Sequence, residues 1–257
     1  MRISCVFPVL NSHEIVRRQL LHFARIGLND LEDVEVIMVD DGSDPPIEVS
    51  ACSLRRFTLI ATHETHPWTS ALARNAGVRA AVGEYVIVVD VDHILSRELI
   101  DRCRALKEDR MGFLREYGML DDQGVFTQDS AALVAFGLPE SRSTGAGLHI
   151  GYHTNQYCMR RSLYWDLGGY SEDLVFNMPY PQPVDKAFKR LFDDRIAAGT
   201  ATQCVNRPTI YMFPSGQHCA GGDVDTNPFG LFHTLTRKTV RNPWASAYRR
   251  ARAMAVK

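Results

Sequence analysis

The chain has 257 residues, of which 45% are hydrophobic and 23% are charged, and its formal net charge is −1. This composition is typical of a soluble globular protein, and no apolar run reaches the roughly 20 residues of a membrane-spanning helix. The six cysteines are widely spaced without a CxxC pair, which favours reduced thiols in a cytoplasmic protein over a disulfide framework or a zinc site.

The first third of the chain alternates strand and helix patterns. Apolar runs predict strands over residues 2–10, 34–40, 57–64 and 84–90, and helical patterns lie over residues 12–27 and 68–83. Ser12 is placed to cap the first of these helices, and Gly83 to end the second. Because the strands are almost continuously apolar and are separated by helices, we expect an α/β fold with a mostly parallel sheet covered on both faces.

The remainder is less regular. We expect helices over residues 96–108 and 183–199, a hairpin over 111–126 with Asp122, Gln123 and Gly124 at its turn, and a further strand over 207–214. Residues 155–174 predict a strand, a short helix and a glycine turn. A glycine-containing loop over 215–227 precedes a basic, helical C-terminal extension.

Polar side chains follow three of the predicted strands at the point where each strand ends. They are Asn11, Asp40, Asp41, Ser43, Asp90 and Asp92. In open α/β sheets, ligands bind in the crevice outside the carboxyl ends of the strands. The sequence therefore predicts a ligand site at this edge of the sheet.

Asp90 and Asp92 flank Val91 directly after a buried strand. Alternate side chains of an extended chain share a face, so the two carboxylates would lie close together and repel each other unless a cation lies between them. Oxygen ligands of this kind suit Mg²⁺ or Mn²⁺. A strand-ending turn is the alternative explanation of the same pair.

Four segments occur in one order: FPVLN, VDDGSD, ARNAGVRAAVGEYVIVVDVD and RRSLYWDLGGYSED. In this respect residues 2–191 resemble the family 2 glycosyltransferases. The resemblance implies a GT-A fold and a metal-dependent, inverting transfer of a sugar from a UDP-sugar donor to an acceptor hydroxyl.

The resemblance also implies roles for individual residues. Pro8, Val9, Asn11, Asp40 and Ser43 would line the nucleotide pocket, with Asp40 on the uracil ring. Arg74 and Asn75 would lie beside the nucleotide, and Asp90, Val91 and Asp92 form the D-x-D motif that holds the metal on the diphosphate.

The chain departs from the family pattern at two positions. His93 stands where a further acid usually follows D-x-D, and Val184 replaces the glutamate of the family's ED pair. The aspartate of that pair is kept as Asp185, which the resemblance implies is the general base. Glu172 and Asp173 are the other candidates for this role.

The resemblance also implies a downstream histidine as a further metal ligand. His218 is the best placed, and His233 is the second candidate. His149 and His153 are candidates for the acceptor pocket.

The charge is unevenly distributed along the chain. No acidic residue follows Asp225, whereas the basic residues there are Arg237, Lys238, Arg241, Arg249, Arg250, Arg252 and Lys257. This tail predicts either a solvated helix or contact with an anionic partner, namely a membrane surface, a nucleic acid or a phosphorylated acceptor. A lipid-linked glycan and a modified nucleic acid are both candidate acceptors.

The domain prediction is a glycosyltransferase domain over 1–226, with a nucleotide-sugar half (1–95) and an acceptor half (96–226), followed by the extension over 227–257. Two other functions stay open. A catalytically silent module would bind a nucleotide sugar without turnover. A nucleotidyltransferase would need a glycine-rich loop with a basic residue after the first strand, and FPVLNSHE lacks it.

Overall fold

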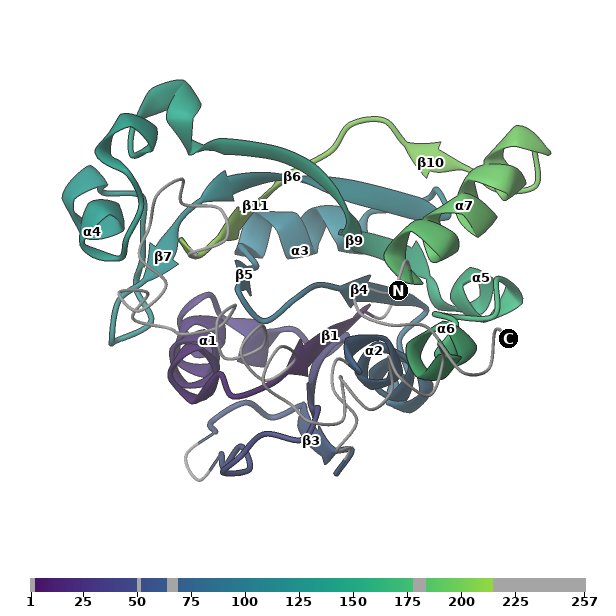
Figure 1. Ribbon diagram of the computed structural model, residues 1–257, viewed down its shortest axis with the longest axis horizontal. Helices are drawn as coiled ribbons and strands as arrows, with labels where there is room; N and C mark the ends of the chain where they lie inside the picture. The colour runs from purple at the N-terminus through teal and green to yellow at the C-terminus, as the bar shows by residue number, and fades with distance from the viewer. Residues whose placement is uncertain (1–2, 50–51, 64–68, 178–183, 215–257) are drawn as a thin grey trace, which may run out of the picture.

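A computed structural model describes residues 3–49, 52–63, 69–177 and 184–214. Their main element is a sheet of nine strands, in which the strand order is β3-β2-β1-β4-β9-β6-β11-β5 and β10 pairs with β6 (Figure 1). The strands are β1 (Ile3–Val9), β2 (Val34–Asp40), β3 (Phe57–Ala61), β4 (Tyr85–Val88), β5 (His93–Ile94), β6 (Arg110–Tyr117), β9 (His149–Arg160), β10 (Gln203–Cys204) and β11 (Thr209–Met212). The helices are α1 (His13–Arg25), α2 (Ser70–Ala80), α3 (Arg97–Arg104), α4 (Ser130–Ala135), α5 (Arg161–Asp166), α6 (Glu172–Asn177) and α7 (Val184–Ala197), with 3₁₀ turns at Leu28–Asp30, Glu140–Arg142 and Gly145–Leu148.

The sheet is parallel in its first half and mixed in its second. Strands β3, β2, β1 and β4 run parallel to their neighbours, so the polar residues at their carboxyl ends lie at one edge, as predicted. Strand β9 then enters antiparallel between β4 and β6. The expectation of a mostly parallel sheet covered by helices is therefore confirmed. The exceptions are the centre, where β9 brings the second half of the chain against the first, and the end of the sheet, where β5 pairs antiparallel with β11.

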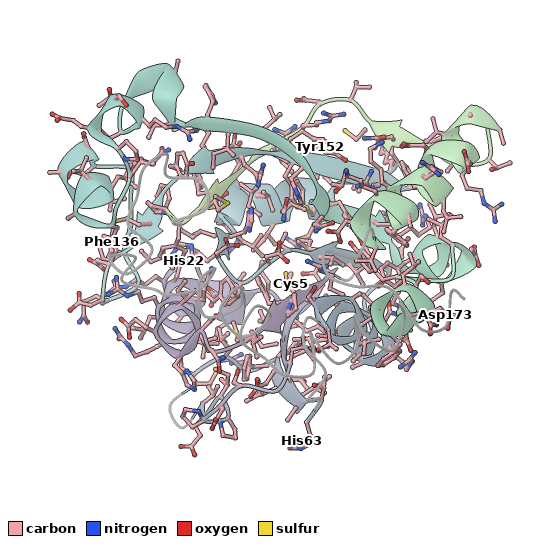
Figure 2. All side chains as sticks on the ribbon, viewed as in Figure 1. Cys5, His22, His63, Phe136, Tyr152 and Asp173 are labelled. Carbon is pink, nitrogen blue, oxygen red and sulfur yellow. The ribbon has the colours of Figure 1, made fainter. Side chains whose placement is uncertain are left out.

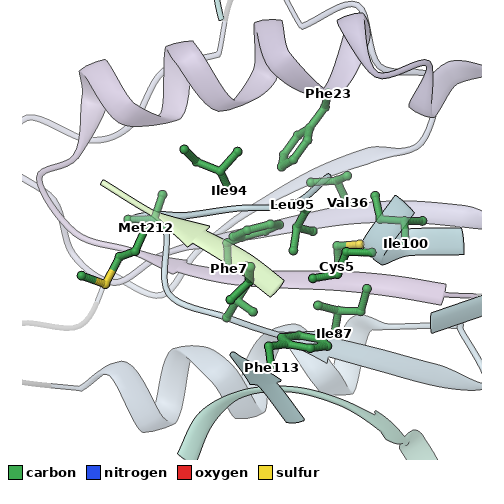
Figure 3. Packing of buried hydrophobic residues seen from close by; sticks show 14 of the residues in the cluster. Cys5, Phe7, Phe23, Val36, Ile87, Ile94, Leu95, Ile100, Phe113 and Met212 are labelled. Atoms are coloured by element: carbon green, nitrogen blue, oxygen red, sulfur yellow. The ribbon is translucent and has the colours of Figure 1, made fainter. Parts of the chain in front are cut away.

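Helices cover both faces of this sheet. On one face, α1 and α3 bury residues such as Phe23 and Ile100 against Phe7, Ile87 and Phe113 (Figure 3). The ring centroids of Phe7 and Phe23 lie 5.6 Å apart. On the other face, α2, α5, α6 and α7 pack against β1, β2, β4 and β9 in a second apolar cluster. The helices that carry the predicted site residues Arg74 and Asp185, α2 and α7, thus lie on the same face.

The buried side of α1 is not wholly apolar. Its buried residues are Ile15, Val16, Gln19, His22 and Phe23, whereas Leu21 is 39% exposed. Two polar side chains therefore occupy core positions of the 3.6-residue period. Ser12 stands at the N-cap position, but its hydroxyl donates to the carbonyl of Leu10 rather than accepting a backbone N–H, so the predicted side-chain cap is wrong.

Helix α2 packs closely against β1 and β2, and it ends at Ala80 rather than at Gly83. A Cβ atom added at Gly77 would lie 2.4 Å from Cγ1 of Val6 and 3.1 Å from Cγ2 of Val39. We expect Gly77→Ala to lower the free energy of unfolding by about 1–2 kcal/mol, because overpacking outweighs the better helix propensity of alanine. Urea unfolding followed by circular dichroism measures this, with exposed Ala80→Ser as a control that changes it by less than about 0.5 kcal/mol. Equal stability of Gly77→Ala and wild type would contradict the close packing.

The predicted hairpin over 111–126 is shorter than expected. Only β7 (Met119–Leu120) and β8 (Phe126–Thr127) pair with each other, and the predicted turn residues lie between them. Residues 110–117 instead form β6 of the main sheet. The other expected helices and strands of the second half are present, and β9 begins at His149, earlier than predicted.

The predicted basic extension, the boundary at residue 226 and His218 all lie outside the described residues. Within the part of the chain that the structure describes, no helix has both the length and the apolar character needed to cross a bilayer.

Candidate active site

The loops after β1 and β2 are tied to each other by side chains that the sequence singled out. The Asn11 backbone N–H donates to the hydroxyl of Ser43 (2.8 Å), and the backbone N–H of Asp44 donates to Oδ1 of Asn11 (2.8 Å). Asn11 itself has a φ of 49°, a left-handed conformation that asparagine tolerates better than most residues. The predicted nucleotide-pocket residues after these strands therefore do lie together.

Asp40 is buried at the end of β2, and its carboxylate shapes the following loop. Its Oδ1 accepts from the backbone N–H of Ser43 (2.9 Å), and its Oδ2 accepts from that of Ile47 (2.8 Å). Each oxygen keeps a further acceptor direction, so contact with a uracil ring stays a prediction. Asp41, the next residue, is also buried and accepts from the hydroxyl of Thr69 at 2.7 Å. Pro8 and Val9 are the last residues of β1, next to β2.

The D-x-D segment places three candidate metal ligands together. Asp90, Asp92 and His93 each offer a ligand atom, and these atoms lie within 4.8 Å of one another. Nδ1 of His93 contacts Oδ1 of Asp92 at 2.7 Å, and Nε2 of the same buried ring has no hydrogen-bond partner within the described part of the chain. Val91 between the aspartates points into the core.

The two aspartates have different surroundings. The carboxylate of Asp90 accepts from the Arg74 guanidinium and from the Gln156 side-chain amide, the latter at 3.1 Å. Burial raises the pKa of Asp90, but Arg74 and His93 outweigh burial, and the pKa is lowered overall. The free oxygen of Asp92, by contrast, meets no hydrogen-bond donor among the residues that the structure describes. Asp92 and His93 are thus the groups with coordination capacity to spare.

Arg74 is a cation beside the first aspartate of the D-x-D motif, and it reaches a second acid as well. It is buried in α2, and its guanidinium donates to Asp90 and to Oδ1 of Asp185, the latter at 3.3 Å. It also lies over the ring of Tyr170, 5.2 Å from the centroid. One arginine therefore connects the D-x-D motif to the predicted general base.

Asp185 lies in the first turn of α7, and its side chain is 31% exposed. It is close enough to Tyr170 and His153 to influence the pKa of both groups. A carboxylate with one oxygen anchored by an arginine and with access to solvent is suited to accept a proton from a bound hydroxyl group. The alternative acids lie on α6, where Glu172 accepts from the side-chain amide of Asn75 at 3.0 Å (Asp173, its neighbour, is labelled in Figure 2).

Asn75 holds the glycine turn that follows α5. Its amide donates to the Tyr170 carbonyl (2.8 Å), and its Oδ1 accepts from the Tyr164 hydroxyl (2.7 Å) and the Tyr170 backbone N–H (3.0 Å). Gly169 has a φ of +67°, and a Cβ atom there would lie 2.8 Å from Oδ1 of Asn75, so the turn requires glycine. The predicted position of Asn75 beside the nucleotide stays a prediction, whereas its contacts with this turn are direct.

Strands β6 and β9 supply site residues that sequence reasoning did not place. Gln156 contacts Asp90, and Arg115 is a buried cation whose Nε donates to the Gly151 carbonyl (3.2 Å). Burial lowers the pKa of Arg115, and nearby Asp92 and Asp90 oppose this. Burial and Arg115 likewise lower the pKa of His153. The sequence pattern of β6 did not predict that Arg115 lies near Asp90 and Asp92. That position depends on how β6 pairs with β9, whose register shifts beside Arg115.

Comparisons with known proteins agree with this architecture. Residues 4–116 match the family model described as glycosyl transferase family 2. Glycosyltransferase GlyG of Streptococcus pneumoniae is 30% identical over 101 residues, which cover 38% of this chain and 33% of that protein. The chain thus aligns with about a third of the length of this curated relative.

Solved structures share the fold at low sequence identity. TarS (residues 1–349) of S. aureus in complex with UDP-GlcNAc has a TM-score of 0.51 and 17% identity, over 87% of this chain and 62% of that chain. Mannosyltransferase PcManGT of Pyrobaculum calidifontis in complex with GDP-Man and Mn²⁺ has a TM-score of 0.50 and 18% identity, over 99% and 74%. Taken with the family match and the sheet topology, these findings show that the segment over residues 4–116 belongs to glycosyltransferase family 2 within a chain of the GT-A fold.

Proposed function

We propose that this protein transfers a sugar from a UDP-sugar donor to an acceptor hydroxyl, with inversion at the anomeric carbon. The observation that carries the proposal is the connection of Asp90 to Asp185 through Arg74, beside loops that end β1 and β2. Sugar transfer requires a site that binds the donor's diphosphate and, near the same sugar, a base that accepts the proton of the acceptor hydroxyl. Asp90 and Asp185 are candidates for these two roles. The complexes of TarS with UDP-GlcNAc and of PcManGT with GDP-Man support a nucleotide-sugar donor.

In this mechanism Asn11, Asp40 and Ser43 hold the nucleoside. Asp185 accepts the proton of the acceptor hydroxyl, whose oxygen forms the new bond to the anomeric carbon. The bond from that carbon to the diphosphate oxygen breaks with its electron pair, and the nucleoside diphosphate leaves. Arg74 orients Asp185, because its guanidinium donates to Oδ1 of that carboxylate.

The residues present fit a divalent cation. Asp92 offers a carboxylate oxygen without another donor, Asp90 lies beside it, and His93 adds an imidazole within the same 4.8 Å cluster. Hard oxygen ligands suit Mg²⁺ or Mn²⁺, and the imidazole nitrogen favours Mn²⁺ of the two. When bound, such an ion stabilises the negative charge that develops on the leaving diphosphate. His218 stays a prediction for a further ligand, and PcManGT with Mn²⁺ supports the choice of ion.

The first test is calorimetry of UDP binding with Mn²⁺, with Mg²⁺ and with EDTA. We expect UDP binding to require the metal and to weaken at least about tenfold in Asp92→Ala. This variant loses the carboxylate oxygen that accepts no hydrogen bond from the described residues and is therefore free to bind the metal. Asp122→Ala, at an exposed turn, is the control and should bind like wild type. Metal-independent binding, or none, would mean that the D-x-D segment is a strand-ending turn or that the donor carries another base, in which case GDP is tested next.

The proposed acceptor is a molecule that bears a hydroxyl group, and the basic tail would help to bind it. The protein itself would be cytoplasmic and would lie against a membrane or a nucleic acid. A catalytically silent nucleotide-sugar-binding module is the second candidate, and the replacements at His93 and Val184 favour it. Turnover distinguishes the two.

A further inference from the structure

The buried face of α1 carries two polar residues that donate to the backbone of the D-x-D segment. The side-chain amide of Gln19 donates to the carbonyls of Val91 (3.0 Å) and His93 (2.8 Å). Gln19 is fully buried, so the two bonds form without competition from water. The carbonyls that it holds flank Asp92 on both sides.

His22, one turn further along α1, continues the same contact (His22 is labelled in Figure 2). Its Nε2 lies 2.9 Å from the Leu95 carbonyl, and its Nδ1 lies 3.2 Å from the Gly124 carbonyl. Gln19 and His22 together meet the carbonyls of residues 91, 93 and 95, which run from the turn at residues 91–92 through the short strand β5. A neutral imidazole has one N–H, and the shorter contact favours the tautomer in which Nε2 donates to Leu95, so Nδ1 only lies beside the turn between β7 and β8.

The segment is well packed by its apolar side chains, but its other backbone hydrogen bonds are few. Strand β5 is only two residues long and pairs with β11 at the end of the sheet. Its further backbone bonds run from the His93 N–H to the Asp90 carbonyl (3.0 Å) and from the Phe213 N–H to the Asp92 carbonyl (2.9 Å). Without Gln19, the carbonyls of Val91 and His93 would be left facing an apolar core.

Packing alone does not explain why a glutamine occupies position 19. A leucine at this core position would stabilise the packing of α1 without the cost of burying an amide, and Oε1 of Gln19 meets no hydrogen-bond donor from any residue that the structure describes. A half-satisfied amide in the core is favourable only where its donors contribute something that an apolar residue cannot. Both donors are used on the residues adjacent to Asp92.

We infer that Gln19 and His22 are positioning residues, which fix the carbonyls of residues 91–95 and thereby aim Asp92 and His93 at the metal site. The effect on metal binding rests on the proposed function. The support of residues 91–95 by Gln19 and His22 does not depend on it. Supporting contacts of this kind commonly change metal affinity by about 10–100-fold when they are removed.

The test compares Gln19→Met, which keeps the shape of the side chain but removes its donors, with Ile15→Ala. Ile15 is buried on the same face of α1 and makes no polar contact, so its variant reports the loss of packing alone. Hydrogen exchange is measured on peptides that cover residues 91–95, and Mn²⁺ affinity is measured by electron paramagnetic resonance in the presence of UDP.

We expect Gln19→Met to raise the exchange rate of this segment at least about fivefold and to weaken Mn²⁺ binding about tenfold. Ile15→Ala should lower the melting temperature at least as much while leaving both readouts near wild type. Unchanged exchange in Gln19→Met, or an equal rise in Ile15→Ala, would overturn the inference. If wild type binds no Mn²⁺, the proposed metal site fails, and hydrogen exchange still decides whether Gln19 supports the segment.

Discussion

Replacing Asp185 with asparagine should lower the rate of sugar release by about 10²–10⁴-fold and leave UDP binding unchanged. The amide keeps the shape of the carboxylate and an oxygen for the Arg74 guanidinium, which lies 3.3 Å from Oδ1 in wild type. It cannot accept a proton, and general bases contribute rate factors of this size. Binding of UDP depends on the loops after β1 and β2 and on the D-x-D segment, none of which the substitution alters.

The measurement is release of UDP from a panel of UDP-sugars with water as the acceptor, which does not require the natural acceptor. Asp194→Asn is the matched control, because Asp194 is an exposed residue of the same helix and should behave like wild type. Glu172→Gln and Asp173→Asn test the other acids. A loss of turnover in one of these variants, with Asp185→Asn active, would move the base to α6.

Wild-type behaviour separates the two candidate functions. A protein that binds UDP but releases none from any UDP-sugar, under conditions where the metal is bound, is a silent module. In that case the ion bridge from Asp90 through Arg74 to Asp185 would be a structural link between the halves of the sheet. Turnover that disappears in Asp185→Asn is incompatible with that explanation.

The parts of the site that the sequence predicted are those that follow from local patterns. Apolar runs located the first strands, and the polar residues after them had to meet because parallel strands end at one edge. The ligand atoms of Asp90 and Asp92 do lie close together, but a turn at residues 91–92 brings them there rather than the alternation of an extended chain that the prediction assumed. Each of these inferences depends on residues only a few positions apart.

The contacts that the sequence did not predict are long-range. Arg74 was expected beside the nucleotide, but its partner Asp185 is 111 residues away and is brought close by β9 and α7. Periodicity identifies which face of a helix is buried, not which strand approaches it. Gln19 and His22 illustrate the same limit: the amphipathic pattern of α1 passed over them as polar, although they occupy its buried face and reach carbonyls more than 70 residues on.

Arg74→Met is the substitution that we expect to affect stability and turnover together. The variant would leave the carboxylates of Asp90 and Asp185 without their shared cation, so their two negative charges would no longer be compensated. The Arg74 side chain is 4% exposed and its partners about a third exposed, so solvent screens part of the cost. Breaking a fully buried ion pair costs about 3–5 kcal/mol, and for this partly screened one we expect about 2 kcal/mol in the free energy of unfolding.

The same variant should raise the pKa of Asp90, which Arg74 and His93 lower in wild type against the effect of burial. Titration of the Asp90 side chain by NMR measures this change directly. Arg79→Met is the matched control, because Arg79 lies on the same helix, is 68% exposed, and makes only peripheral contacts, with Glu172 at 3.9 Å and with the Trp165 ring at 5.5 Å from its centroid. Its stability and its Asp90 titration should stay close to those of wild type.

Arg74→Lys distinguishes charge from geometry. A lysine ammonium restores a positive charge but not the planar fork that reaches two carboxylates at once, so this variant should recover part of the stability and little of the UDP release. Full recovery of turnover with lysine would show that only the charge matters and that Asp185 needs no orientation by Arg74. Lost stability with normal turnover in Arg74→Met would instead separate the ion bridge from catalysis and leave Asp185 to be positioned by α7 alone.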